Sequence, residues 1–261
     1  MKNSILLILC FFIVSCNFFD RSGKVIEREY YSDGGLKSET ELKDGKRNGM
    51  VRNYSERGRL LSTTEYVNDL REGWLINYSS ETGAPELKGF FKNDTQSGPV
   101  IQYYREGMLF RESNYVKGRI DGVVKTFWAN GKLKAENFYK MGKLSVGLKE
   151  YDKEGNLIIK RPEIIFHELN QLALFDRLVL KISVSDEAED VEFYSDELAE
   201  GKYLPTHAFA LQVIDGVATL EYPVMRGAAY KKRLSIIAKF RTKNGNTMLT
   251  HRYYDLIIMN K

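Results

Sequence analysis

Histidine and cysteine, which often serve as catalytic groups or metal ligands, are rare in this 261-residue sequence. There are three histidines, His167, His207 and His251, and two cysteines, Cys10 and Cys16. No histidine stands at metal-ligand spacing from another histidine or a cysteine. The sequence also contains no Gly-x-Ser-x-Gly elbow, phosphate-binding loop or dinucleotide fingerprint. We therefore predict a protein that is not an enzyme, with no catalytic residue, metal site or cofactor.

Two further hypotheses, a Ca²⁺ site and a glycan hydrolase, depend on carboxylates. The acidic run Asp186-Glu187-Ala188-Glu189-Asp190 offers oxygen ligands of the kind that Ca²⁺ prefers. It lacks the glycine and terminal glutamate of an EF-hand loop, so we interpret it as a solvated connection between strands. An envelope glycan hydrolase built on an unusual carboxylate pair is a remote alternative.

Cys16 is the side chain with the most specific chemistry. It follows Ile13, Val14 and Ser15, which place an aliphatic residue at −3 and a small residue at −1. This pattern resembles a bacterial lipobox, and the resemblance implies cleavage before Cys16 and acylation of its thiol and amino groups with chains such as palmitate. Such a double modification gives a firm membrane anchor, because each buried methylene contributes about 0.8 kcal/mol.

The residues before Cys16 fit this interpretation. Lys2 provides a positive start, and the apolar run over residues 5–14 is too short to cross ~30 Å of hydrocarbon as a helix. An ordinary secretory signal and an uncleaved helix remain alternatives. Because Asn17 is not the aspartate that retains enterobacterial lipoproteins in the inner membrane, we expect an outer-membrane lipoprotein that faces the periplasm.

The amino-acid composition indicates the fold class. Hydrophobic residues make up 43% and charged residues 28%, which is typical of a globular chain. The 39 Lys and Arg against 35 Asp and Glu give a net charge of only +4, so we expect no nucleic-acid partner. Aromatic residues reach 12%, and 21 glycines stand beside 5 prolines. This balance favours strands and turns, and therefore an all-β protein.

The middle of the chain repeats with a period of 24 or 25 residues, which indicates one supersecondary unit used several times. Four columns of residues keep this period. The first column is Gly49, Gly73, Gly98, Gly122 and Gly147. The second is aromatic: Tyr54, Tyr78, Tyr103, Phe127 and Tyr151. The third is Gly35, Gly58, Gly83, Gly107, Gly131 and Gly155. The fourth is Leu60, Leu109, Leu133 and Leu157.

Each repeat contains two turn signals, such as Asp44-Gly45 and Asn130-Gly131, separated by about eight residues rich in aromatic and β-branched side chains. Each repeat is therefore predicted to be a β-hairpin, and successive hairpins should pair into an elongated antiparallel meander sheet. The aromatic column should form a ladder along this sheet and is a candidate interaction face.

The pattern Gly-x4-Tyr/Phe-x3-Gly-x-Leu-x5-Tyr/Phe resembles the bacterial MORN-repeat variant of proteins labelled YwqK-type antitoxin components. The resemblance covers residues 30–158 and implies a hairpin-repeat sheet that acts as an interaction platform. Eukaryotic MORN repeats have been proposed to bind acidic phospholipids, but we interpret the basic turn Lys43–Arg47 as solvated. In the third repeat Pro85 occupies the leucine position, where we expect a bulge or bend.

The period stops after Leu157, and the last hundred residues read as a second set of strands. We expect strands at 164–168, 178–184, 191–194, 208–214, 217–222, 234–241 and 247–258, with two-residue hairpins at Asp215-Gly216 and Asn244-Gly245. About seven strands fit an immunoglobulin-like β-sandwich, an architectural likeness that says little about activity.

These observations predict four segments: a signal peptide over 1–15, a tether over 16–28, hairpin repeats over 29–159 and a β-sandwich over 160–261. The predicted function is a lipid-anchored, non-enzymatic envelope protein whose repeats bind an envelope protein or a glycan. The antitoxin label gives the alternative, an immunity protein that neutralises a partner toxin.

Overall fold

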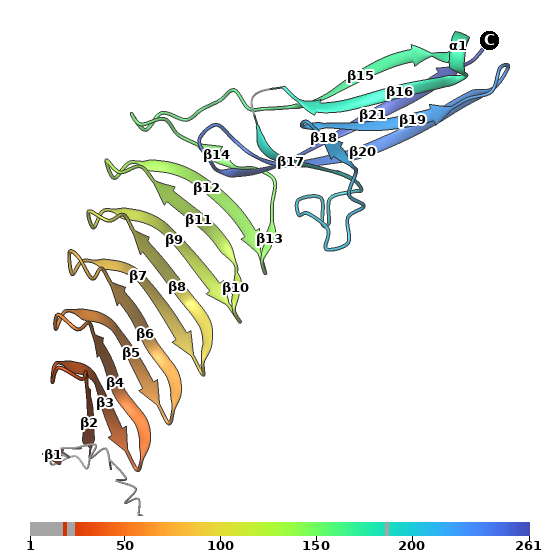
Figure 1. Cartoon of the computed structure of the whole chain (residues 1–261). Helices are drawn as coiled ribbons and strands as arrows, with labels where there is room; N and C mark the ends of the chain where they lie inside the picture. The colour runs from red at the N-terminus through yellow and green to blue at the C-terminus, as the bar shows by residue number, and fades with distance from the viewer. Residues whose placement is uncertain (1–17, 20–23, 186–187) are drawn as a thin grey trace, which may run out of the picture. The chain divides into compact units, whose positions relative to one another are not determined.

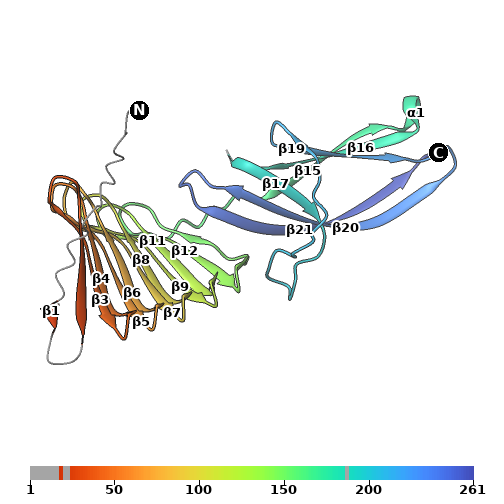
Figure 2. The same cartoon turned by 60° about the horizontal axis from the view of Figure 1, so that its bottom comes forward.

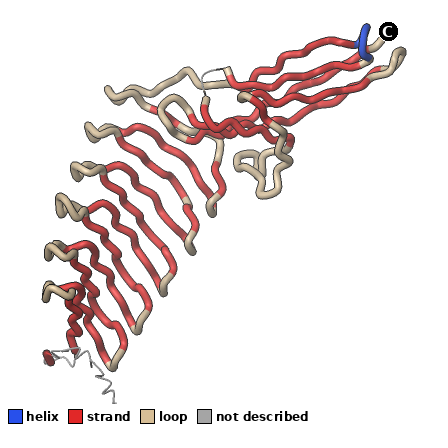
Figure 3. The backbone as a smooth tube through the Cα atoms, viewed as in Figure 1, coloured by secondary structure: helices blue, strands red, loops and turns tan. Residues whose placement is uncertain are grey.

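The computed structural model describes residues 18–19, 24–185 and 188–261. Within these residues it contains 21 strands and a single four-residue helix, so the all-β prediction is confirmed (Figure 3). The chain divides into two compact units, Met1–Thr95 and Gln96–Lys261, and each is described by itself below. The four segment boundaries expected from the sequence stay predictions.

The first unit consists of hairpin repeats. Its strands are β1 (Phe18–Phe19), β2 (Val25–Tyr30), β3 (Leu36–Lys43), β4 (Lys46–Tyr54), β5 (Leu60–Val67), β6 (Leu70–Tyr78) and β7 (Pro85–Lys92). Every strand pairs antiparallel with its neighbours in sequence, which makes a meander (Figure 1). The predicted hairpin repeat is confirmed.

The second unit begins with the remaining repeats. Their strands are β8 (Thr95–Tyr103), β9 (Leu109–Val116), β10 (Arg119–Ile120), β11 (Gly122–Phe127), β12 (Leu133–Lys140), β13 (Lys143–Leu144) and β14 (Lys149–Glu150). Here too β8, β9, β11 and β12 pair in chain order, while β13 and β14 both pair with β12.

Two kinds of turn close the hairpins, and the sequence explains both. At one end Asp44 and Gly45 have φ of 52° and 73°, and Asn68 and Asp69 have 50° and 70°. Two consecutive positive φ values define the type I′ turn, which suits the twist of the flanking strands. At the other end Gly58 has φ of 73° and donates its N–H to the Ser55 carbonyl at 2.8 Å, which makes a three-residue loop.

Gly49 and Gly73 of the first glycine column each lie at a β-bulge inside a strand. The pairing of β5 with β6 shifts between Thr64 and Tyr66, opposite Gly73, whose φ is 120°. A Cβ at Gly73 would lie 2.0 Å from Glu65 Oε2, and one at Gly49 would lie 2.2 Å from Glu41 Oε2. Glycine is required at both positions because the backbone is left-handed and a carboxylate fills the space that a side chain would need.

Two smaller sheets follow in the second unit. One contains β15 (Ile164–Gln171), β16 (Arg177–Val184), β19 (Val217–Pro223) and β18 (Val213–Ile214), and the other contains β17 (Glu189–Ser195), β20 (Ala229–Arg241) and β21 (Thr247–Met259). The short helix α1 (Leu172–Phe175) joins β15 to β16. Figure 2 shows β16 and β19 on one side and β20 and β21 on the other.

The two smaller sheets share one core. Leu180 and Ile182 of β16 and Ile236 and Leu256 of the other sheet are completely buried in one apolar cluster. Along β16, Lys181 is exposed between the buried Leu180 and Ile182, whereas Val179 is buried as well. The number of strands agrees with the seven expected, whereas the immunoglobulin-like topology stays a prediction.

Two local predictions in this region are wrong. The Asn244-Gly245 pair does not form a two-residue hairpin, because Thr242 donates its N–H to the Asn246 carbonyl at 2.9 Å and closes a three-residue loop. The segment 208–214 is a strand only at Val213–Ile214. Its first half bridges to β17 through Ala210 and its last residues pair with β19, so the segment crosses from one sheet to the other.

Candidate functional site

The predicted aromatic column lies at the ends of the repeat strands. All five residues are half-buried: Tyr54, Tyr78, Tyr103, Phe127 and Tyr151. The Tyr54 hydroxyl donates to Glu39 Oε2 at 3.2 Å, and the Tyr151 hydroxyl donates to Glu136 Oε2 at 3.4 Å. Burial and the nearby Glu39 carboxylate raise the pKa of Tyr54. The hydroxyl groups of these two tyrosines are therefore hydrogen-bonded to the preceding strand.

A register shift accompanies the aromatic residue in hairpin after hairpin. Pairing is irregular at Tyr54, Tyr78, Tyr103 and Phe127 alike. Pro85 pairs with Tyr78, as Leu60 pairs with Tyr54. The irregularity expected at Pro85 is therefore present, but it belongs to the repeat and is not caused by the proline.

A row of alternating charges runs across the strands on the side to which Tyr54 and Tyr151 turn. In the first unit Arg28 Nε lies 2.8 Å from Glu39 Oε1, and Glu39 is also the cross-strand neighbour of Arg52. The hydrogen bond from Arg28 holds the pKa of Glu39 below its usual value.

In the second unit the row runs through four consecutive cross-strand positions, Glu112, Lys125, Glu136 and Lys149. Opposite charges that face each other across strands stabilise a sheet. This row gives the repeats a wide, polar, regularly spaced surface.

Sequence reasoning missed the residues that fasten one repeat to the next. Each of these residues directly follows the aromatic residue at the end of a repeat strand and opens the next loop. The Tyr31 hydroxyl donates to the Tyr54 carbonyl at 2.6 Å, and the Tyr104 hydroxyl donates to the Phe127 carbonyl at 2.7 Å. The Trp128 indole N–H donates to the Tyr151 carbonyl at 3.1 Å. Their common spacing of 23 residues to the acceptor is a signal that could have revealed them.

Arginines fasten the opposite ends of the hairpins. Arg47 Nε lies 3.1 Å from Asp69 Oδ1, and its guanidinium lies 4.2 Å from the centre of the Tyr66 ring. Arg71 repeats both contacts with Asp94 at 2.8 Å and Phe91 at 4.2 Å. Arg47 of the basic turn is thus engaged inside the repeat, so it adds little to a phospholipid site.

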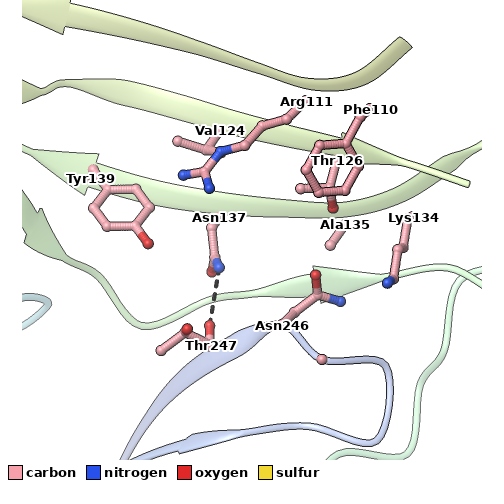
Figure 4. Close-up of a pocket in the computed structure, with 11 residues that line it drawn as sticks. Phe110, Arg111, Val124, Thr126, Lys134, Ala135, Asn137, Tyr139, Asn246 and Thr247 are labelled. Atoms are coloured by element: carbon pink, nitrogen blue, oxygen red, sulfur yellow. Dashed lines mark hydrogen bonds between the residues drawn. The ribbon is translucent and has the colours of Figure 1, made fainter. Parts of the chain in front are cut away.

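A pocket of about 170 Å³ lies in the second unit between the last repeat strands and the loop from β20 to β21 (Figure 4). Its lining residues are Phe110, Arg111, Val124, Thr126, Lys134, Ala135, Asn137, Tyr139, Gly245, Asn246 and Thr247. Two contacts hold the loop in place: Asn137 Nδ2 donates to the Thr247 carbonyl at 3.0 Å, and Asn246 Nδ2 donates to Glu150 Oε1 at 2.6 Å. No local sequence pattern predicts this pocket, because its two walls are about 110 residues apart.

The pocket is polar and positively charged. Burial lowers the pKa of Lys134, partly offset by Glu150, and burial raises the pKa of Tyr139. Lys134 Nζ also lies 4.5 Å from the centre of the Trp128 indole ring. The Arg111 guanidinium forms no ion pair with any residue that the structure describes. The pocket can therefore bind an anionic or polar group.

The histidines and acidic residues do not assemble into a recognisable catalytic or metal centre within residues 18–19, 24–185 and 188–261. No group of three or more His, Cys, Asp or Glu side chains there is arranged to hold a metal ion. His251 Nε2 lies 2.8 Å from Ser235 Oγ, and burial lowers the pKa of His251. Ser235 Oγ also donates to the Asp196 carbonyl at 2.6 Å, so this pair belongs to the polar packing of the sheet.

The lipobox residues Ile13, Val14, Ser15 and Cys16 lie outside the described residues, and lipidation stays a prediction. In the part of the chain that the structure covers, no helix combines the length and apolar character that a bilayer span requires.

Sequence comparison agrees with the hairpin geometry. Residues 120–141 match the model of a family described as the MORN repeat variant. No protein of curated function matches the chain. The matched MORN repeat variant comprises β11 and β12, with Gly122, Phe127, Gly131 and Leu133 in their columns. Because the other hairpins carry the same columns with the same register shift, the repeat description extends to their geometry. Membership of the YwqK-type antitoxin family stays a prediction.

Proposed function

We propose that this chain is a lipid-anchored, non-enzymatic protein of the bacterial envelope, whose hairpin repeats bind an envelope protein or a glycan. The observation that carries the proposal is the repeat itself. Each hairpin presents the same backbone geometry and adds to rows of charged and aromatic side chains. Extended repeat surfaces of this kind suit large partners, because many weak contacts add along the array.

The charge-row side of the repeats is the surface that we assign to the partner. Arg28, Glu39 and Arg52 lie there, and Ile76 continues the row with Thr63 on its neighbouring strand. An apolar residue in a row of polar and charged ones is typical of the mixed surfaces that proteins and sugars both contact. The lipobox supports the envelope location, and an outer-membrane position facing the periplasm belongs to the same proposal.

A pair of adjacent substitutions tests which face binds. Ile76→Asp and Asn77→Asp each introduce one carboxylate, and alternation along β6 directs them to opposite faces. The full chain and both variants are used to capture proteins from envelope extract and to cosediment with purified peptidoglycan. We expect Ile76→Asp to lose the captured partner and Asn77→Asp to keep it.

Equal capture by both variants, with circular dichroism showing both folded, would exclude the charge-row side. Absence of any partner in both assays would contradict the scaffold. A captured toxin encoded beside this gene would instead identify an immunity protein, the alternative that the family label suggests.

A further inference from the structure

The pocket of Figure 4 contains acceptors and donors that nothing in the described chain satisfies. Thr126 Oγ1 and Asn137 Oδ1 are buried side-chain oxygens without a hydrogen-bond partner. The contact of Asn137 Nδ2 with the Thr247 carbonyl fixes the orientation of the amide, so Oδ1 is the atom left for a ligand. Buried polar atoms in folded proteins are nearly always paired, and leaving one unpaired costs about 1–3 kcal/mol.

Two positively charged side chains line the pocket. Arg111 and Lys134 both line it, and Arg111 makes no ion pair within the described residues. Glu150, the carboxylate whose charge acts on Lys134, accepts hydrogen bonds from Thr242 and Asn246 on its Oε1, at 2.6 Å each. An arginine fork binds a carboxylate through two parallel hydrogen bonds. The Phe110 and Tyr139 rings add apolar wall on either side (Figure 4).

We propose that this pocket binds a small carboxylate that also carries hydroxyl groups, of the size of one acidic sugar residue. The carboxylate lies against Arg111, and a hydroxyl donates to Asn137 Oδ1, which is shielded from solvent in this structure and is uncovered by a small side-chain movement on binding. With a volume of about 170 Å³, the pocket is of a size for a single sugar ring. The inference rests on the proposed function, because it names a glycan class for the second unit.

The test is a titration of the full chain with D-glucuronate, methyl β-D-glucuronide, D-glucose and acetate, followed by NMR signals of the Arg111 and Asn137 side chains. We expect saturable shifts with glucuronate and much weaker binding of glucose, which lacks the carboxylate, and of acetate, which lacks the hydroxyls. Binding of the methyl glycoside as well as the free acid supports a glycan end as the natural source. Binding of the free acid alone supports a soluble metabolite.

Arg111→Gln should weaken glucuronate binding by about tenfold to a hundredfold, as expected for loss of a charge-assisted hydrogen bond. Arg119→Gln is the matched control, since Arg119 is an exposed arginine of β10 that lies outside the charge row and does not line the pocket, and it should leave binding unchanged. If Arg111→Gln does not fold, Thr126→Val supplies the second variant. It should weaken binding by about three- to tenfold and raise the melting temperature of the free protein, because it removes an unpaired buried hydroxyl.

No saturation by glucuronate, or equal affinity for acetate, would overturn the proposal and reduce the pocket to an adventitious anion site. Equal weakening by Arg119→Gln would overturn it too, because it would show a diffuse charge effect. Partner capture that still depends on Ile76 in such a case would leave the scaffold proposal intact, so the two failures can be told apart.

Discussion

Replacing Gly73 by alanine probes the bulge that defines every repeat. The new Cβ would lie 2.0 Å from Glu65 Oε2, 2.8 Å from Glu65 Cδ and 3.0 Å from Glu65 Cβ. The carboxylate can swing away, but Glu65 Cβ is fixed to the neighbouring strand. Left-handed backbone costs an alanine about 1–2 kcal/mol, and overpacking adds about 1–3 kcal/mol. We therefore expect the free energy of unfolding to fall by about 2–5 kcal/mol.

Gly58→Ala is the matched control. Its φ is also positive, at 73°, but no atom lies within 4 Å of the position of the new Cβ. Only the backbone preference is then lost, and the expected cost is about 1 kcal/mol. Urea unfolding of the full chain, with hydrogen exchange of the β5 and β6 amides as the local readout, measures both variants.

A double-mutant cycle separates strain from collision. Adding Glu65→Ala to Gly73→Ala removes the two closer contacts and should recover about 1 kcal/mol or more. The reasoning fails if Gly73→Ala costs no more than Gly58→Ala. It also fails if Glu65→Ala gives no recovery, because the carboxylate would then not be what reserves the space beside Gly73.

Three further outcomes follow from the contacts described. The Arg71 side chain and backbone N–H hold the pKa of Asp94 below its usual value. This contact therefore stabilises the fold at pH values above the unfolded pKa of ~3.9, and the stabilisation is lost as the pH falls through the folded pKa. NMR titration of Arg71→Gln should show the pKa of Asp94 rising toward its usual value, and an unchanged pKa would refute the assignment. Tyr104→Phe removes the donor to the Phe127 carbonyl and should lower the free energy of unfolding in urea by about 1 kcal/mol. A loss below about 0.3 kcal/mol, the error of such a comparison, would show that this hydrogen bond does not hold the two repeats together. Cys16→Ser should move the chain from the membrane fraction to the soluble fraction. Treatment with globomycin should cause a longer precursor of the parent chain to accumulate. Persistence of the Cys16→Ser variant in the membrane fraction would refute lipid anchoring.

Much of the fold was predictable because the turns and bulges of the repeat depend on residues that are close together in the sequence. The type I′ turns need residues that accept positive φ, and Asp44-Gly45 and Asn68-Asp69 provide them. The bulge needs a glycine, and Gly73 recurs at the required interval. Such requirements involve one residue and its immediate neighbours, so a single sequence reveals them.

Predictions that depended on strand register were less secure. Asn-Gly fits both a two-residue and a three-residue loop, and the register of β20 with β21 goes with the longer one. The segment 208–214 alternates like a strand, yet it bridges to β17 through Ala210 and pairs with β19 through its last two residues. Neither result could be read from local preference.

The sequence by itself determined the hairpin, its period, its turns and the all-β class, since these follow from backbone preferences and from alternation. Only the tertiary structure decided which side chains are engaged and which are left for a ligand. Asn137 and Thr247 are 110 positions apart and meet because the loop from β20 to β21 lies on the last repeats. A pocket defined by such a meeting depends on long-range packing, and no local pattern encodes it.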